Sequence, residues 1–287
     1  MSGSLFSHTR YNPFYIIFTD LDGTLLDHNT YDWKNALPAL EKCQQMGIPI
    51  IISSSKTKAE IIPICRKIGI THPFTTENGG GIYFAKQYFN ILPPDSIPEG
   101  EYWKVSLGLD YETLVKDLSM IRKELGWKIK GFSDMSAKEI SRMTGLDYQT
   151  SILAKQREYD EPFIIEDEPV DTDPLFKAAK KRGISCFQGG RFYHLQGKND
   201  KGKAMNKIIS WYQNSHKDIT SIALGDSPND FPMLMNADYP VLIRSKRSFP
   251  ALKKDIPQLD ITKDMGPVGW NSAVFNLLLK KEELHNG

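Results

Sequence analysis

The sequence has few cysteines, no excess of charge of either sign and no long apolar run. Its 3 cysteines are far apart and match no zinc-binding spacing, which favours buried or free thiols in a reducing compartment. The chain carries 36 basic and 35 acidic residues, and its net charge of +1 is too small to draw it to nucleic acid or to a membrane. No apolar run approaches the roughly 20 residues that span a bilayer, and the polar stretch over residues 1–13 lacks the apolar core of a signal peptide. These absences predict a cytoplasmic protein that binds neither nucleic acid nor membranes.

Short apolar runs alternate with helical patterns towards both ends of the chain. Tyr15–Thr19, Ile48–Ile52 and Ile219–Leu224 are typical of strands that are buried on both faces. Helices are predicted over Lys34–Met46 and Lys58–Ile68, because a glycine follows each pattern directly. Strands and helices that alternate with short connections predict an α/β domain, in which helices cover a parallel sheet.

The middle of the chain has a different pattern, with strands and helices that do not alternate strictly. Strand-like pieces occur near Phe89–Leu92, Tyr102–Leu107, Pro162–Ile165 and Ile184–Phe187, and helical stretches over Tyr111–Leu125, Ala137–Thr144, Tyr148–Lys155 and Pro174–Arg182. This pattern predicts an α+β domain inserted into the first one. We place the inserted domain at residues 86–191 and the first domain at residues 1–85 and 192–287.

The sequence Asp20-Leu21-Asp22-Gly23-Thr24 follows the first predicted strand. Because a strand has a period of two, Asp20 and Asp22 point to the same side, beyond the carboxyl end of the strand where α/β sheets bind ligands. Adjacent carboxylates repel each other unless a cation compensates, and Mg²⁺ prefers oxygen ligands. With a metal and a phosphate present, Asp20 could attack phosphorus, and Asp22 could serve as general acid and base. An ordinary turn is the alternative, since Asp, Gly and Thr are common in turns.

A second acidic motif, Gly225-Asp226-Ser227-Pro228-Asn229-Asp230, follows the late strand. Ser227 can cap a helix that begins at Pro228. A capped helix does not explain Asp226, which lies at the end of the strand and could meet Asp20 over a metal. Asp230 and Asn229 would support that site or bind the metal through water. The predicted metal ligands are Asp20, Asp22, Asp226 and Asp230.

Two further segments could bind a phosphate. The turn after Ile48–Ile52 contains Ser54, Ser55 and Lys56, whose hydroxyls and backbone N–H groups can form an anion site. Lys201 opens a later helix, where its charge can neutralise both a phosphate and Asp20. Taken singly, such a serine is more often a helix cap and such a lysine is more often solvated.

In this order, the four segments resemble the haloacid dehalogenase superfamily of phosphatases, and the resemblance covers nearly the whole chain. It implies a Rossmann-like core, an inserted cap domain of the C2 type above the site, and Mg²⁺ as cofactor. It also implies roles for single residues: Asp20 is the nucleophile, Asp22 the general acid and base, Ser54 the phosphate-binding hydroxyl, Lys201 the active-site lysine and Asp226 the metal-binding acid.

Segments outside these motifs resemble the mannosyl-3-phosphoglycerate phosphatase family. They include Ser54–Glu60, Glu77–Gly79, Ala154–Tyr159, Gly189–His194 and Gly266–Asn271. This resemblance implies hydrolysis of mannosyl- or glucosyl-3-phosphoglycerate to the glycosylglycerate, a small phosphorylated substrate with a carboxylate that a cationic side chain can bind. The candidate substrate-binding residues are Ser55, Lys56, Asn78, Arg157, Arg191 and Asn229.

Three other functions fit the same motifs. A general sugar-phosphate phosphatase would differ in its substrate panel, and a phosphomutase would form an isomer instead of releasing inorganic phosphate. A non-catalytic binding protein with this fold would turn over no phosphate ester with Mg²⁺. The sequence leaves the sugar and the oligomeric state open.

Overall fold

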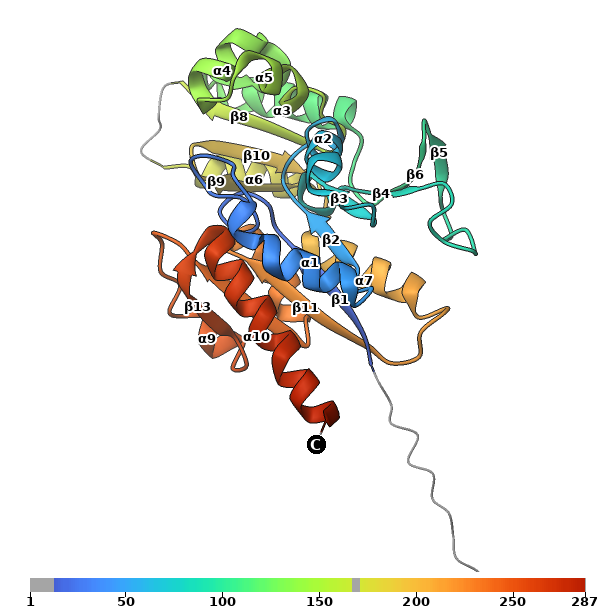
Figure 1. The fold of residues 1–287 in the computed structure, drawn as a ribbon. Coiled ribbons are helices and arrows are strands. Elements are labelled where there is room, and N and C mark those ends of the chain that lie inside the picture. Colours follow the sequence, from blue (N-terminus) through green and yellow to red (C-terminus); the bar gives the residue numbers. More distant parts are fainter. Residues whose placement is uncertain (1–12, 167–170, 287) are drawn as a thin grey trace, which may run out of the picture.

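The larger of two β-sheets forms the centre of the protein (Figure 1). The computed structural model describes residues 13–166 and 171–286; residues 1–12, most of the polar N-terminal stretch, lie outside the described residues. Within these ranges the sheet has nine strands in the order β13-β12-β11-β1-β2-β3-β4-β6-β5, parallel from β13 to β3 and antiparallel beyond. The strands are β1 (Phe14–Thr19), β2 (Ile50–Ser53), β3 (Phe74–Thr76), β4 (Gly81–Ala85), β5 (Ile97–Glu99), β6 (Tyr102–Ser106), β11 (Ile219–Gly225), β12 (Tyr239–Arg244) and β13 (Asp260–Met265).

Helices cover both faces of this sheet. On β1, Ile17 belongs to the core beneath α1, α2 and α10, whereas Ile16 and Phe18 belong to the core beneath α7, α8 and α9. Alternating side chains of one strand therefore enter two separate cores, as expected for a doubly covered parallel sheet. Among the described residues, no helix is both long and apolar enough to cross a membrane. The helices are α1 (Leu37–Gln45, after a 3-10 turn at Lys34–Ala36), α2 (Lys58–Ile68), α7 (Lys201–Tyr212), α8 (Phe231–Asn236), α9 (Leu252–Asp255) and α10 (Gly266–Asn286).

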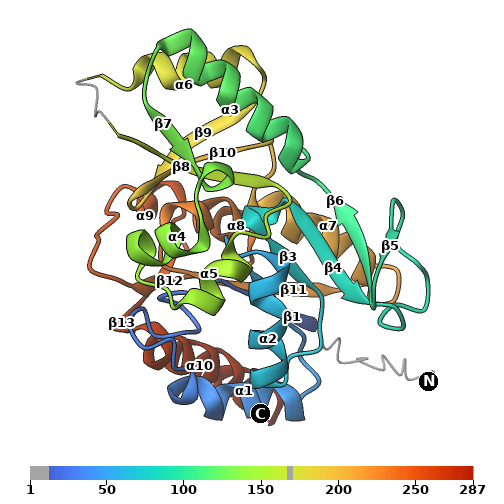
Figure 2. The same ribbon diagram turned by 90° about the horizontal axis from the view of Figure 1, so that it is seen from above.

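A smaller unit lies above one end of the large sheet (Figures 1 and 2). In the described part of the chain its antiparallel sheet has the order β7-β8-β10-β9. Phe163 on β8 packs against α3 and α6, and its neighbour Ile164 packs against the cluster that contains α4. The predicted α/β core with a parallel sheet and an inserted α+β domain is therefore confirmed. The elements of this unit are α3 (Tyr111–Leu125), β7 (Ile129–Gly131), α4 (Ala137–Thr144), α5 (Tyr148–Ala154), β8 (Asp160–Ile165), α6 (Asp173–Lys181), β9 (Ser185–Gly189) and β10 (Phe192–Gln196).

The strand pairing divides the chain differently from the predicted boundaries at 85/86 and 191/192. β5 and β6 follow residue 86 but pair in the large sheet with β4, and β10 follows residue 191 but pairs in the small sheet with β8. By strand pairing, the chain crosses between the units near residues 107–110 and 197–200. A short β-rich segment looks the same in either sheet, so only its hydrogen-bond partners reveal where it belongs.

The predicted strand at Phe89–Leu92 is wrong, because these residues lie in bends and irregular structure. The ring of Phe89 packs against Tyr88, Trp211 and Tyr212 at centroid distances of 4.9, 5.9 and 5.3 Å. Ile91 remains 69% exposed, so the run has no buried face. The apolar side chain of Phe89 thus packs in an aromatic cluster and does not indicate a strand.

Candidate active site

The chain leaves β1 through a turn that places Asp20 at the carboxyl edge of the large sheet. The Asp20 backbone N–H donates to the Leu224 carbonyl at 2.9 Å, which ties the residue to β11. Gly23 has a φ of +78°, and a Cβ there would lie 2.8 Å from Asp226 Oδ2. Only glycine combines that backbone angle with such a close approach, so Gly23 lets the two acidic loops come together.

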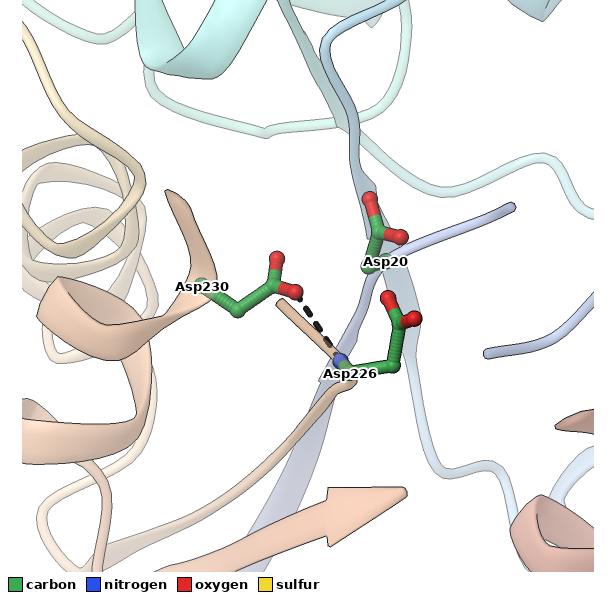
Figure 3. Close-up of side chains that lie close together, drawn as sticks. All are labelled: Asp20, Asp226 and Asp230. Carbon is green, nitrogen blue, oxygen red and sulfur yellow. Dashed lines mark hydrogen bonds between the residues drawn. The ribbon is translucent and has the colours of Figure 1, made fainter. Parts of the chain in front are cut away.

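Three of the four predicted metal ligands meet at this edge (Figure 3). Carboxylate oxygens of Asp20, Asp226 and Asp230 all lie within 4.8 Å of one another. Lys201 is fully buried beside them, and its Nζ lies 2.6 Å from Asp20 Oδ1 and 2.6 Å from Asp230 Oδ1. Asp22 lies outside this acidic group, so its place among the metal ligands stays a prediction.

The loop after β11 is held by the carboxylate of Asp230. Asp230 Oδ2 accepts hydrogen bonds from the backbone N–H groups of Asp226 and Ser227, both at 3.0 Å. A 3-10 turn begins at Pro228 with Ser227 as its N-cap residue, as predicted, and the Ser227 hydroxyl donates to Asn229 Oδ1 at 2.6 Å. Asp230 therefore shapes the loop that presents Asp226, whether or not it also touches a metal.

Burial dominates the electrostatics of the acidic group. It raises the pKa of Asp20 to about 8, with Lys201 opposing the increase and the charges of Asp230 and Asp226 adding to it. It also raises the pKa of Asp226 to about 6, again with a contribution from Asp230. Three carboxylates share one lysine here, so the ionised group has two uncompensated negative charges. An all-oxygen donor set with excess negative charge fits a hard divalent cation.

The turn between β2 and α2 holds the predicted phosphate-binding residues. Ser54 is buried, and its hydroxyl accepts from the Lys56 N–H at 3.2 Å, which leaves the hydroxyl hydrogen free to donate to a phosphate. The Ser54 backbone is fixed on both sides, by Thr75 O at 3.2 Å and by the Asn78 N–H at 3.0 Å. Lys56 Nζ lies 2.8 Å from Asp22 Oδ2, so the structure pairs this lysine with the predicted general acid.

Three consecutive residues with left-handed backbone angles connect the site to the inserted domain. The φ values are 49° at Glu77, 56° at Asn78 and 82° at Gly79. Asn78 Oδ1 accepts from Asn229 Nδ2 at 3.0 Å, while the Glu77 carboxylate accepts from the Tyr159 N–H at 2.8 Å. Positive φ is costly for residues other than glycine and tends to occur at functional sites. The turn thus joins the acidic loop on one side to the inserted domain on the other.

Arg157 lies in the segment that Glu77 holds, and its side chain is only 5% exposed. Its Nη2 donates to Ser55 O at 3.1 Å and to Asp160 Oδ2 at 2.6 Å, and its Nε donates to Asp160 O at 2.8 Å. The guanidinium also lies 3.6 Å from Glu77 Oε2. These contacts favour a role in positioning the phosphate-binding turn, and binding of a substrate carboxylate by Arg157 stays a prediction without support from this geometry.

We expect Arg157→Ala to lower kcat/KM by about tenfold or more on every phosphate ester, small aryl phosphates included. The substitution leaves the Glu77 and Asp160 carboxylates buried without their cation, so it should also lower the melting temperature. Arg142→Ala, which changes an exposed arginine on α4, is the matched control. A loss confined to glycosyl-3-phosphoglycerates, with an unchanged melting temperature, would instead support substrate binding.

Arg191 and Glu77 complete the comparison with the predicted site. Arg191 is exposed in the turn between β9 and β10, and its contact with substrate stays a prediction. Glu77 is missing from the predicted residues, although it is fully buried and holds the inserted domain. Its sequence signal is its place directly before Asn78-Gly79, a pattern that is common in ordinary turns.

Comparison with known proteins connects this geometry to a family. A family of haloacid dehalogenase-like hydrolases matches residues 17–248. The chain is 39% identical over 274 residues to a glucosyl-3-phosphoglycerate/mannosyl-3-phosphoglycerate phosphatase of Methanococcoides burtonii, covering 94% of this chain and 99% of that protein. It is 41% identical over 268 residues to the enzyme of that name from Persephonella marina, covering 92% of this chain and 97% of that protein.

Solved structures share the fold at low sequence identity. A Thermoplasma acidophilum protein superposes with a TM-score of 0.66 at 18% identity, covering 93% of this chain and 100% of that one. The sugar phosphatase BT4131, of subclass IIB of the same superfamily, superposes with a TM-score of 0.61 at 15% identity, with 92% and 98% covered. These likenesses support the arrangement of core and inserted domain.

Proposed function

Because the chain belongs to the haloacid dehalogenase-like hydrolases, we propose that it is a phosphatase that hydrolyses glycosyl-3-phosphoglycerates to glycosylglycerates and inorganic phosphate. The observation that carries the proposal is the convergence of Asp20, Asp226 and Asp230 around the buried Lys201. The names of the two phosphatases, which match nearly the whole chain, support the substrate, and both names include glucosyl and mannosyl forms. We also propose a cytoplasmic location, which the free thiols of Cys43, Cys65 and Cys186 in the described part of the chain support.

We propose the following roles for the side chains in the reaction. An Asp20 carboxylate oxygen forms a bond to phosphorus while the bond from phosphorus to the substrate oxygen breaks, which gives an aspartyl-phosphate. Asp22 donates a proton to the departing oxygen and then takes one from the water that attacks the aspartyl-phosphate. This second step releases inorganic phosphate and restores Asp20. Lys201 offsets the negative charge of Asp20 and the phosphate, and the Ser54 hydroxyl binds a phosphate oxygen.

We propose Mg²⁺ as the cofactor, held by Asp20 and Asp226 with the support of Asp230. The oxygen donors and the surplus of negative charge fit this ion. When bound, Mg²⁺ would neutralise phosphate charge and align the phosphoryl group with the nucleophile.

Activity should require Mg²⁺, and Ca²⁺ should replace it poorly. Mg²⁺ enforces a tight octahedron, whereas Ca²⁺ accepts more ligands at longer distances. A second carboxylate oxygen drawn onto Ca²⁺ would turn Asp20 away from in-line attack. The measurement is phosphate release after EDTA treatment and after the return of each ion; full activity in EDTA contradicts the prediction.

Mg²⁺ should stabilise the protein more at pH 8 than at pH 6. The pKa is raised from 3.8 to about 8 for Asp20 and to about 6 for Asp226, so the folded protein binds more protons than the unfolded chain between these values. Without metal, the free energy of unfolding therefore falls as the pH rises through this range. A bound cation offsets this cost, so the stabilisation should grow over the same range. Melting temperatures in EDTA and in Mg²⁺ at pH 5, 6, 7 and 8 measure it. A metal-induced shift that stays constant or falls with pH contradicts the prediction.

A substrate panel tests the function itself. Purified enzyme with Mg²⁺ is assayed for phosphate release from mannosyl-3-phosphoglycerate, glucosyl-3-phosphoglycerate, 3-phosphoglycerate, hexose phosphates and an aryl phosphate. We expect the largest kcat/KM on one of the two glycosyl-3-phosphoglycerates. A higher value on hexose phosphates would indicate a general sugar phosphatase, and isomer formation without phosphate release would indicate a mutase.

A further inference from the structure

A pocket of about 440 Å³ opens between the core and the inserted domain, beside the turn that holds Lys56. Its size lies within the roughly 300–1,000 Å³ of typical small-molecule sites. Helix α5 lies next to α2 in both views (Figures 1 and 2), and the Thr57 hydroxyl on the core donates to the Leu153 carbonyl at 2.9 Å. The lining of the pocket comes from the loop after β1, from α2 and from the link between α4 and α5. It includes Tyr31, Trp33, Lys56, Ile64, Leu146 and Thr150.

One residue of the lining, Lys56, connects the pocket to the catalytic groups. Lys56 lines the pocket, and its Nζ lies 2.8 Å from Asp22 Oδ2. Asp22 Oδ1 is buried and has no hydrogen-bond partner among the described residues. Because Asp22 is the proposed proton donor to the departing oxygen, the group attached to that oxygen begins its path beside Asp22 and Lys56. The pocket is therefore placed to receive the part of the substrate that is not the phosphate.

We propose that this pocket binds the glycosyl group of the substrate and that Lys56, in its lining, binds the glycerate carboxylate. The inference rests on the proposed function and extends it to the residues that select the sugar. A hexose has apolar C–H faces and a rim of hydroxyls, so it suits a lining that combines two aromatic side chains with polar and charged ones. Tyr31 and Trp33 supply the aromatic surface. Polar groups come from Lys67, Asp147 and Thr150, and because the Thr150 hydroxyl donates to Asp147 Oδ2 at 2.5 Å, it can only accept from a sugar.

Lys56 is the cation that links the pocket lining to Asp22, and its ammonium group already faces two carboxylates. The Lys56 side chain is 10% exposed, and its Nζ lies 5.3 Å from the centre of the Tyr31 ring. Its carboxylate neighbours are Asp22 at 2.8 Å and Glu60 at 3.9 Å. An ammonium group has three donors, so Lys56 can keep its bond to Asp22 and still bind a substrate carboxylate. In glycosyl-3-phosphoglycerate this carboxylate lies on the carbon next to the sugar linkage, so both groups enter the pocket together.

The test compares substrates with and without the sugar. Tyr31→Ala removes an exposed aromatic wall from the core side, and Leu146→Trp fills the pocket from the inserted domain. The assays measure kcat/KM on glycosyl-3-phosphoglycerates, 3-phosphoglycerate and p-nitrophenyl phosphate. Each variant should lose about tenfold or more on the glycosyl substrates, the usual range for lost contacts in an apolar pocket. The loss on the two small substrates should stay within about threefold. Tyr148→Ala, which changes a tyrosine on α5 that is 48% exposed and outside the pocket lining, should change neither.

The outcomes separate this inference from the proposed function. If the wild-type enzyme prefers glycosyl-3-phosphoglycerates but both variants lose equally on all substrates, or lose nothing, the pocket does not bind the sugar and the proposed function stands. If the wild-type enzyme hydrolyses no glycosyl-3-phosphoglycerate, the proposed function and this inference fall together. Unchanged melting temperatures of both variants exclude misfolding as the cause of a selective loss.

Discussion

Replacing Asp20 with asparagine should abolish turnover while leaving the fold intact. The amide nearly keeps the shape of the side chain, but it is neutral and cannot attack phosphorus as an anionic nucleophile. Loss of a nucleophile that acts together with an acid and base costs on the order of 10³-fold or more in kcat. Asp20 also supplies a bond of 2.6 Å to Lys201, and an amide oxygen can still accept it. We therefore expect a folded and nearly inactive protein.

The measurement is phosphate release by purified Asp20→Asn, with mass spectrometry to exclude deamidation back to aspartate. Asp255→Asn changes an exposed aspartate on α9 and should retain full activity. Wild-type protein quenched during turnover should carry a phosphoryl group on the peptide that contains Asp20, and the variant should not. Retention of more than a few per cent of the activity would rule out Asp20 as the nucleophile.

Replacing Lys201 with methionine should remove both activity and stability. Lys201 is fully buried and lies 2.6 Å from carboxylate oxygens of Asp20 and of Asp230. Removing one partner of a buried ion pair typically costs about 3–5 kcal/mol, because the other charge stays buried without compensation. Removing a single preorganised charge or donor from an active site typically costs about 10²–10³-fold in kcat. Both losses should therefore appear in the same variant.

The control is Lys203→Met on the same helix, because the Lys203 side chain is 60% exposed. Thermal melts and phosphate release are measured for both variants with and without Mg²⁺. Because a cation can replace part of the lost lysine charge, Mg²⁺ should raise the melting temperature of Lys201→Met more than that of the wild type. Wild-type stability of Lys201→Met in EDTA would contradict the ion-pair network, whatever its activity.

Local signals in the sequence determined much of the fold. The observed helices α2, α3 and α4 have the predicted bounds, because each has a capping residue at its start and a glycine directly after its end. The strand β1 and the acidic motif that follows it are likewise recognised from adjacent residues, by an apolar run and by the two-residue spacing of Asp20 and Asp22. Such interactions act within a few residues, so a single sequence reveals them.

Only the tertiary structure decided which of the predicted site residues meet. Lys201 and Asp20 are 181 positions apart, and the packing of α7 beside the edge of the sheet brings them together. Elsewhere the fold pairs Asp22 with Lys56 and brings Arg157 to Ser55. Residue type predicts that a buried carboxylate or guanidinium needs a partner. Which group becomes that partner depends on the side chains that the fold places within contact distance. This also applies to β6 and β10, whose sheets depend on hydrogen bonds to strands elsewhere in the chain.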